Sequence, residues 1–187
     1  MWAIPRLDNW SSMQVFAVMT RPPFWPGPVS GWVTRLHQGL LRSALSGQAN
    51  AILVSPHLGG EDLGHCRISE RGRERRLAHA VRLAGDAVVA NLHGSNVPDT
   101  PDVVLSEIER SRAFAEGLAR PGDVVVLAGD FNLPDVRLRS YSEPAAGVDH
   151  VLVKGGRASA PVVWARERRV HAQILLSDHP PVEVTIG

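Results

Sequence analysis

The stretch VVVLAGDFN, residues 124–132, decides how the rest of this 187-residue sequence is interpreted. Its first five residues are apolar without alternation, which predicts a strand covered on both faces. Asp130 and Asn132 follow directly, two residues apart. In an extended chain residues i and i+2 project to the same side, so a carboxylate and an amide oxygen would face one point, and hard cations such as Mg²⁺ take oxygen ligands of this kind. Gly-Asp-x-Asn is also good turn chemistry, and this alternative stays open.

Polar side chains also stand at the ends of three other predicted strands. These are His93 after the strand 86–92, Asp149 near the start of the strand 148–153, and Asp178 with His179 before the strand 182–186. A sheet fixes the mutual positions of groups at its strand ends, which is how many active sites are built. A histidine becomes an effective base when a carboxylate holds one ring nitrogen, so we predict that Asp149 pairs with His179 and that Asp178 is available as a metal ligand. Taken singly, each motif also fits a strand-entry turn or a solvated histidine.

The remaining patterns predict a mixed α and β chain arranged as a layered sandwich. Further strands are expected over residues 14–19 and 51–54 and in part of 75–83, with helices from Ser30 to Gly47 and from Thr100 to a point before Pro121. In the second helix the early acids Asp102 and Glu107 suit the positive helix start.

Composition narrows the class of protein. With 44% apolar and 21% charged residues the chain is globular, and its length predicts one domain over residues 1–187, with a divergent segment at 1–30. The net charge of +1 argues against a mainly electrostatic binder of nucleic acid or membrane, although a local patch remains possible. Cys66 is the only cysteine, and no apolar run reaches membrane-spanning length. We expect a soluble, cytoplasmic monomer without membrane contact.

The densest run of positive charge lies between residues 67 and 76, where five arginines face two glutamates. We interpret it as a solvated edge or loop. Attraction of a phosphate backbone is the alternative.

Four motifs, taken in order along the chain, resemble the endonuclease/exonuclease/phosphatase family, which has the DNase I-like fold. They occupy residues 89–93, 126–132, 148–153 and 176–182. The resemblance implies an α+β fold of four layers, α/β/β/α, with two β-sheets face to face between helices. It also implies hydrolysis of a phosphate ester with the help of a divalent metal, Mg²⁺ or Mn²⁺.

The resemblance further implies a role for each site residue. Asp130 and Asn132 would bind the metal or attacking water and the phosphate, and Asp178 would be a metal-site acid. His179, paired with Asp149, would be the general base or transition-state stabiliser. His93 would contact the phosphate or assist the leaving group. The substrate class stays open between nucleic acid, sugar or inositol phosphate, and lipid, because the fold does not choose between them.

The start of the chain departs from the family pattern. Members normally begin with a strand ending in Asn, a helix, and a second strand ending in Gln-Glu, whose glutamate is the principal metal ligand. Here the usual first strand and helix are missing, and Met19 and Thr20 stand where Gln-Glu would be. A truncated start or a degenerate member with weakened metal binding would account for this. An active metal-dependent phosphoesterase is therefore the leading hypothesis, and a catalytically impaired member that binds a phosphorylated ligand or is structural is the second. A nucleic-acid-binding module is the third.

Overall fold

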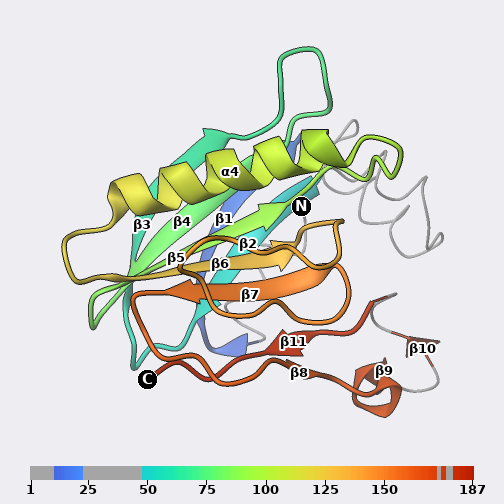
Figure 1. The fold of residues 1–187 in the computed structure, drawn as a ribbon. Coiled ribbons are helices and arrows are strands. Elements are labelled where there is room, and N and C mark those ends of the chain that lie inside the picture. Colours follow the sequence, from blue (N-terminus) through green and yellow to red (C-terminus); the bar gives the residue numbers. More distant parts are fainter. Residues whose placement is uncertain (1–10, 23–47, 172–173, 176–178) are drawn as a thin grey trace.

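The computed structural model describes residues 11–22, 48–171, 174–175 and 179–187. Its centre is a five-stranded mixed sheet in the order β3-β4-β5-β6-β7 (Figure 1). Three two-stranded antiparallel pairs, β1 with β2, β8 with β11 and β9 with β10, complete the described strands. The strands are β1 Gln14–Arg21, β2 Gln48–Val54, β3 Gly60–Arg67, β4 Leu77–Leu83, β5 Ala87–His93, β6 Val124–Asp130, β7 Asp149–Lys154, β8 Val162–Val163, β9 Val170–His171, β10 Ile174–Leu175 and β11 Val182–Glu183.

The helix α4, Pro101–Leu118, connects the parallel strands β5 and β6 and covers one face of the central sheet (Figure 1). Pro101 occupies the first turn, where its missing N–H costs no hydrogen bond, but the side chain of Thr100 makes no capping bond. Val104 and Ile108 pack into the main apolar core with residues of β4 to β7. No helix in the described part of the chain is long and apolar enough to cross a membrane.

The opposite face of the central sheet is covered by strands. The β1–β2 pair contacts β3, β4 and β5, and β11 contacts β7. Phe16 of β1 lies so close to Gly60 of β3 that a Cβ added at Gly60 would be 2.7 Å from its ring. The described residues therefore form a helix layer and two strand layers of the expected α/β/β/α sandwich. The predicted helix from Ser30 to Gly47 lies outside the described residues.

Most predicted elements are confirmed, but one long strand, β3, and the three two-residue strands β8, β9 and β10 were missed. The strands expected near 14–19, 51–54, 75–83, 86–92, 123–128 and 148–153 are present with shifted ends, whereas β11 is shorter than the predicted strand 182–186. The missed strand β3 is an edge strand with a bulge between Asp62 and Gly64, and its outer side faces solvent. Such a strand needs no apolar alternation, so no periodicity reveals it. The arginine-rich run after β3 is a loop, as expected.

Candidate active site

The register of three neighbouring strands places His93, Asp130 and Asp149 side by side at one end of the central sheet. His93 at the end of β5 is the parallel partner of Asp130 at the end of β6. Asp130 is in turn the antiparallel partner of Asp149 at the start of β7. Directly opposite residues on adjacent strands have Cβ atoms about 5 Å apart, so the three side chains can act on one ligand.

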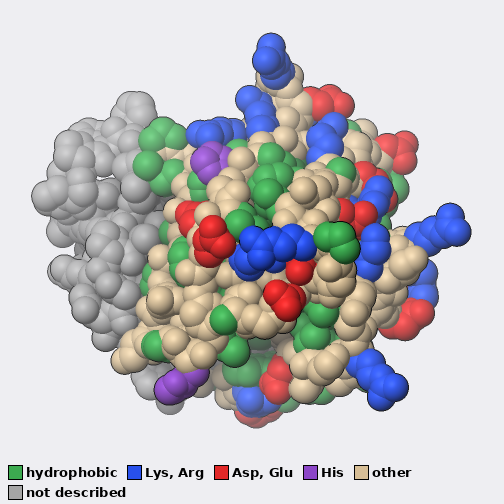
Figure 2. Space-filling model, turned by 90° about the vertical axis from the view of Figure 1, so that its left-hand side faces the viewer, with side chains coloured by type: hydrophobic (Ala, Val, Ile, Leu, Met, Phe, Trp, Pro, Cys, Tyr) green, Lys and Arg blue, Asp and Glu red, His purple; other side chains and the backbone are tan. Residues whose placement is uncertain are grey.

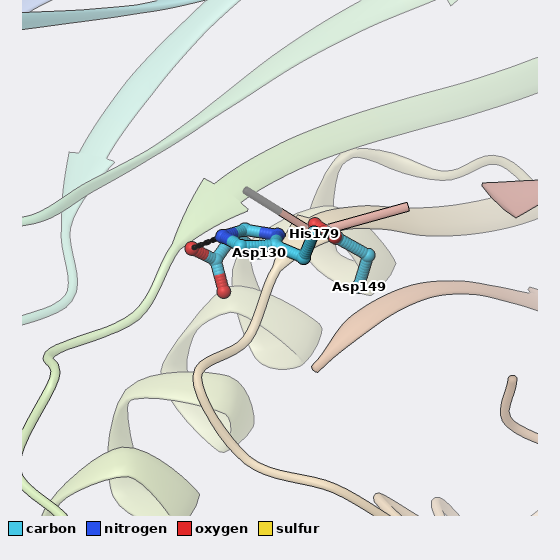
Figure 3. A group of neighbouring side chains, drawn as sticks. All are labelled: Asp130, Asp149 and His179. Atoms are coloured by element: carbon cyan, nitrogen blue, oxygen red, sulfur yellow. Dashed lines mark hydrogen bonds and ion pairs between the residues drawn. The ribbon is translucent and has the colours of Figure 1, made fainter. Parts of the chain in front are cut away.

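His179 joins this row from the segment that precedes β11. Its Nδ1 donates to Asp149 Oδ2 at 2.5 Å, and its Nε2 lies 3.7 Å from Asp130 Oδ2. The imidazole ring thus lies between the two carboxylates, one at each ring nitrogen (Figure 3). The predicted contact between His179 and Asp149 is present, and it leaves Nε2 facing Asp130.

Asp130 Oδ2 lies near a second imidazole, since His93 Nε2 is 3.5 Å away. Burial lowers the pKa of His93, and the positive charge of Arg76 acts in the same direction, while Asp130 opposes both. The net effect is a lowered pKa, so the neutral ring predominates near pH 7. A neutral imidazole can donate a hydrogen bond from its protonated ring nitrogen to an anionic ligand.

Asn132 is placed differently from the extended-chain expectation. The strand ends at Asp130, and Asn132 adopts a left-handed backbone with φ 51°. Its N–H donates to Asp130 Oδ1 at 2.9 Å, which is the turn alternative left open by the sequence. Its side-chain Nδ2 donates to the carbonyl oxygen of Gly94 at 3.0 Å and so ties the end of β6 to the residue after β5. The expectation that both side chains face one point because the chain is extended was therefore wrong.

Glu107 was misplaced by sequence reasoning. It was expected to be an early acid at the helix start, but it lies beyond the first turn of α4 and is fully buried. Its carboxylate accepts hydrogen bonds at 2.8 Å from both the N–H and the hydroxyl of Ser95, the second residue after β5. Glu107 falls on the helical stripe that also carries Val104 and Ile108, and a glutamate on a core-facing stripe is the signal that could have revealed this anchor.

No family model and no curated protein matches this sequence. Solved structures do match. A Bacteroides thetaiotaomicron mannosyl-6-phosphatase has a TM-score of 0.61 at 12% identity, over 98% of this chain and 80% of its own. An endonuclease/exonuclease/phosphatase family protein from the same organism has a TM-score of 0.56 at 12% identity, over 97% and 78%. D. rerio TDP2 complexed with a single strand DNA product has a TM-score of 0.56 at 11% identity, over 99% and 90%. The chain has the DNase I-like fold.

One group of side chains at this sheet end could hold a metal ion, and it includes one of the predicted metal ligands, Asp130. Ligand atoms of Asp130, Asp149 and His179 all lie within 4.8 Å of one another, and they are the one such group found among the described residues. Carboxylate oxygens are the ligands that Mg²⁺ and Mn²⁺ prefer. Asp178, the further predicted metal ligand, lies outside the described residues.

The end of β1 also reaches this end of the DNase I-like sandwich. Arg21 Nη1 lies 3.9 Å from Glu74 Oε1. The negative charge of Glu74 in turn opposes the lowering of the pKa of His93. Thr20 is buried near the end of β1. The correspondence of Thr20 to the family glutamate stays a prediction from the sequence.

A cavity of about 340 Å³ opens beside the His179–Asp149 pair. Its lining is completed by Ala128, Gly129, His150, Val151, Pro181 and Val182. The pair therefore has space beside it on the strand-covered side of β6 and β7.

Proposed function

We propose that this chain is a divalent-metal-dependent hydrolase of phosphate esters. The single observation that carries the proposal is the position of His179, with Asp149 on one ring nitrogen and Asp130 on the other. A shared DNase I-like fold with a mannosyl-6-phosphatase and a DNA-bound protein supports phosphate-ester chemistry in general. The metal, the residue roles and the mechanism belong to the proposal.

His179 is the proposed general base. Asp149 accepts the Nδ1 hydrogen bond and therefore holds the ring in one orientation and stabilises its protonated form. Nε2 is then the nitrogen that takes the proton of the attacking water. His93, on the other side of Asp130, is the proposed donor of a hydrogen bond to a phosphate oxygen or to the leaving group, and its Nε2 lies 3.5 Å from Asp130 Oδ2.

The oxygen donors at this sheet end suit a hard divalent cation. Asp130 is the described carboxylate that would hold it, together with the predicted ligands Asn132 and Asp178. When bound, Mg²⁺ or Mn²⁺ supplies positive charge that offsets the charge developing on the phosphate. Asn132 fixes the turn after Asp130 through its own backbone N–H, so the carboxylate is oriented before any ligand arrives.

The second candidate function is a catalytically impaired protein that binds a phosphorylated ligand at the same residues. It is favoured by Thr20 at the end of β1, because a hydroxyl offers a weaker metal ligand than a carboxylate. The two candidates differ in turnover, not in the location of the ligand.

The decisive experiment is hydrolysis of bis(p-nitrophenyl) phosphate by the purified chain with Mg²⁺, Mn²⁺ or EDTA. We expect release of p-nitrophenol that requires the metal and falls by two orders of magnitude or more in His179→Ala. His57→Ala is the matched control, since His57 is an exposed histidine in the turn after β2. Hydrolysis that His179→Ala leaves intact would contradict the mechanism, and calorimetric metal binding without hydrolysis would favour the impaired alternative.

The cytoplasmic location and the monomeric state stay predictions from the sequence, and the substrate class stays open. Gel filtration tests the monomer, and a panel of nucleotide, sugar-phosphate and phospholipid esters tests the substrate.

A further inference from the structure

The loop between β3 and β4, residues 68–76, is called the basic loop. It carries four arginines and two glutamates, and Arg67 immediately precedes it at the end of β3. The proposed function assigns no role to this loop.

Strand register places the basic loop beside the candidate active site. Ala78 of β4 is the antiparallel partner of Leu92 of β5, so the start of β4 lies next to the end of β5 and His93. The order along this sheet end is therefore the basic loop, His93, Asp130 and Asp149. Strands are about 4.8 Å apart, so a ligand held at Asp130 must extend over roughly 10 Å to meet the loop.

The base of the basic loop is fixed to the core. Ile68 is fully buried in the main apolar cluster, its N–H donates to the carbonyl of Arg76 at 3.0 Å, and Arg110 of α4 donates to its carbonyl. The guanidinium of Arg67 donates to the carbonyls of Ser69, Glu70 and Arg73, within the loop. A loop held by these contacts loses little conformational freedom when it binds a ligand.

Two arginines of the basic loop are left over after its ion pairs are formed. Arg73 faces Glu70 at 3.7 Å, and Arg76 faces Glu74 at 2.9 Å. Arg71 and Arg75 are exposed, and neither has an ion pair or side-chain hydrogen bond with any residue that the structure describes. At the opposite end of the molecule, basic and acidic side chains are interspersed (Figure 2). The loop that carries these two charges lies one strand away from His93, and the charges of Arg76 and Glu74 in the same loop affect the pKa of His93.

We propose that Arg71 and Arg75 bind the backbone phosphates of a single nucleic-acid strand whose scissile phosphate lies at Asp130 and His179. The inference rests on the proposed function and names its substrate class. Exposed guanidinium groups on a pre-ordered loop complement a polyanion, and a strand with several phosphates in a row spans the roughly 10 Å from Asp130 to the loop. A phosphomonoester of a single sugar does not reach it.

The test compares two double variants with the wild-type chain. Arg71→Ser with Arg75→Ser removes the leftover charges, and Arg120→Ser with Arg157→Ser removes two exposed arginines from the opposite end. The measurements are kcat/KM on a short oligothymidylate, kcat/KM on bis(p-nitrophenyl) phosphate, and binding of labelled oligothymidylate by anisotropy at several salt concentrations. Circular dichroism checks that each variant is folded.

We expect the loop variant to bind oligothymidylate about tenfold more weakly than the wild type and to have an about tenfold lower kcat/KM on it. The slope of the logarithm of the binding constant against the logarithm of the salt concentration should be shallower by about 1, while kcat/KM on bis(p-nitrophenyl) phosphate should be unchanged. The opposite-end variant should match the wild type on both substrates. Equal losses in the two double variants, no loss in either, or stronger binding of phosphatidylserine vesicles than of oligothymidylate by the wild type would overturn the proposal. If the wild type fails to hydrolyse bis(p-nitrophenyl) phosphate, the proposed function fails, and the anisotropy measurements still decide this inference.

Discussion

His179 donates through Nδ1 to Asp149, which lies 30 residues earlier in the chain, at a distance of 2.5 Å. Asp149 is held by the pairing of β7 with β6, whereas His179 comes from the segment before β11. The contact therefore links the central sheet to the last strand pair. It orients the Nε2 atom of His179 toward Asp130, so it bears directly on the proposed proton transfer.

Asp149→Asn should lower kcat of phosphodiester hydrolysis by about two orders of magnitude, because an amide can hold the wrong tautomer of His179 and stabilises its charged form poorly. Steady-state kinetics with bis(p-nitrophenyl) phosphate measures this. The double change Asp149→Asn with His179→Ala should be no worse than His179→Ala alone, since the two residues act as a unit. Independent, additive losses would refute the coupling.

Asp130→Asn should weaken Mn²⁺ binding at least about tenfold, because it removes a carboxylate from the group of ligand atoms at the sheet end. Isothermal titration calorimetry measures the affinity. Asp62→Asn is the matched control, since Asp62 also hydrogen-bonds a histidine, His79, at 3.0 Å but lies outside the site on β3. The same affinity in all three proteins would show that the metal binds elsewhere.

Gly129→Ala should destabilise the chain by at least about 2 kcal/mol, because Gly129 has φ 135° and an added Cβ would lie 2.1 Å from the carbonyl oxygen of Leu92. Urea unfolding measures the change. Gly117→Ala in α4 is the control, because a Cβ there meets nothing within 4 Å, and it should stabilise by about 0.5 to 1 kcal/mol. Equal effects of the two substitutions would argue against the close β5–β6 approach.

Glu107→Leu should cost about 1 to 3 kcal/mol of unfolding free energy, since it leaves the buried N–H and hydroxyl of Ser95 without their acceptor. Glu107→Gln should restore most of the loss, because its carbonyl oxygen still accepts from the Ser95 N–H. Chemical denaturation of the three proteins at one pH measures the series. If Gln is as harmful as Leu, the charge rather than the hydrogen bond holds the loop after β5.

Asp123 should give the chain a pH-dependent stability. The N–H of Arg120 and the guanidinium of Arg82 lower the pKa of Asp123 below its ordinary value. A carboxyl with a lowered folded pKa contributes stability that is present above the unfolded pKa, near 4, and is lost as the pH falls through the folded pKa. Asp123→Asn should therefore have a lower free energy of unfolding than the wild type at pH 7. This gap between the two proteins, measured by urea unfolding, should close below about pH 4.

The matched control for this pH dependence is Asp135→Asn, which changes an exposed loop aspartate and should show no such gap at either pH. A gap between Asp123→Asn and wild type that stays constant with pH would contradict the assignment.

Local patterns were sufficient for the central strands because these strands are buried on both faces. Val125, Val126 and Leu127 of β6 are all buried, and an uninterrupted apolar run is what such a position demands. The edge strand β3 has one side in solvent and a bulge, so its sequence carries no comparable period. Glu107 was misjudged for a related reason: helix-dipole reasoning considers only the helix itself, whereas Ser95 comes from another element.

The sequence by itself determined which residues stand at strand ends, the order of the motifs and their resemblance to a DNase I-like fold. Only the tertiary structure decided that His179 meets both Asp149 and Asp130, that Asn132 turns back onto Asp130, and that the basic loop lies beside His93. The physical reason is that strand burial is a local property of side chains, written along the chain. Contacts across 30 or more residues depend on register and on the path of loops, and the polar residues that make them leave no periodic signal.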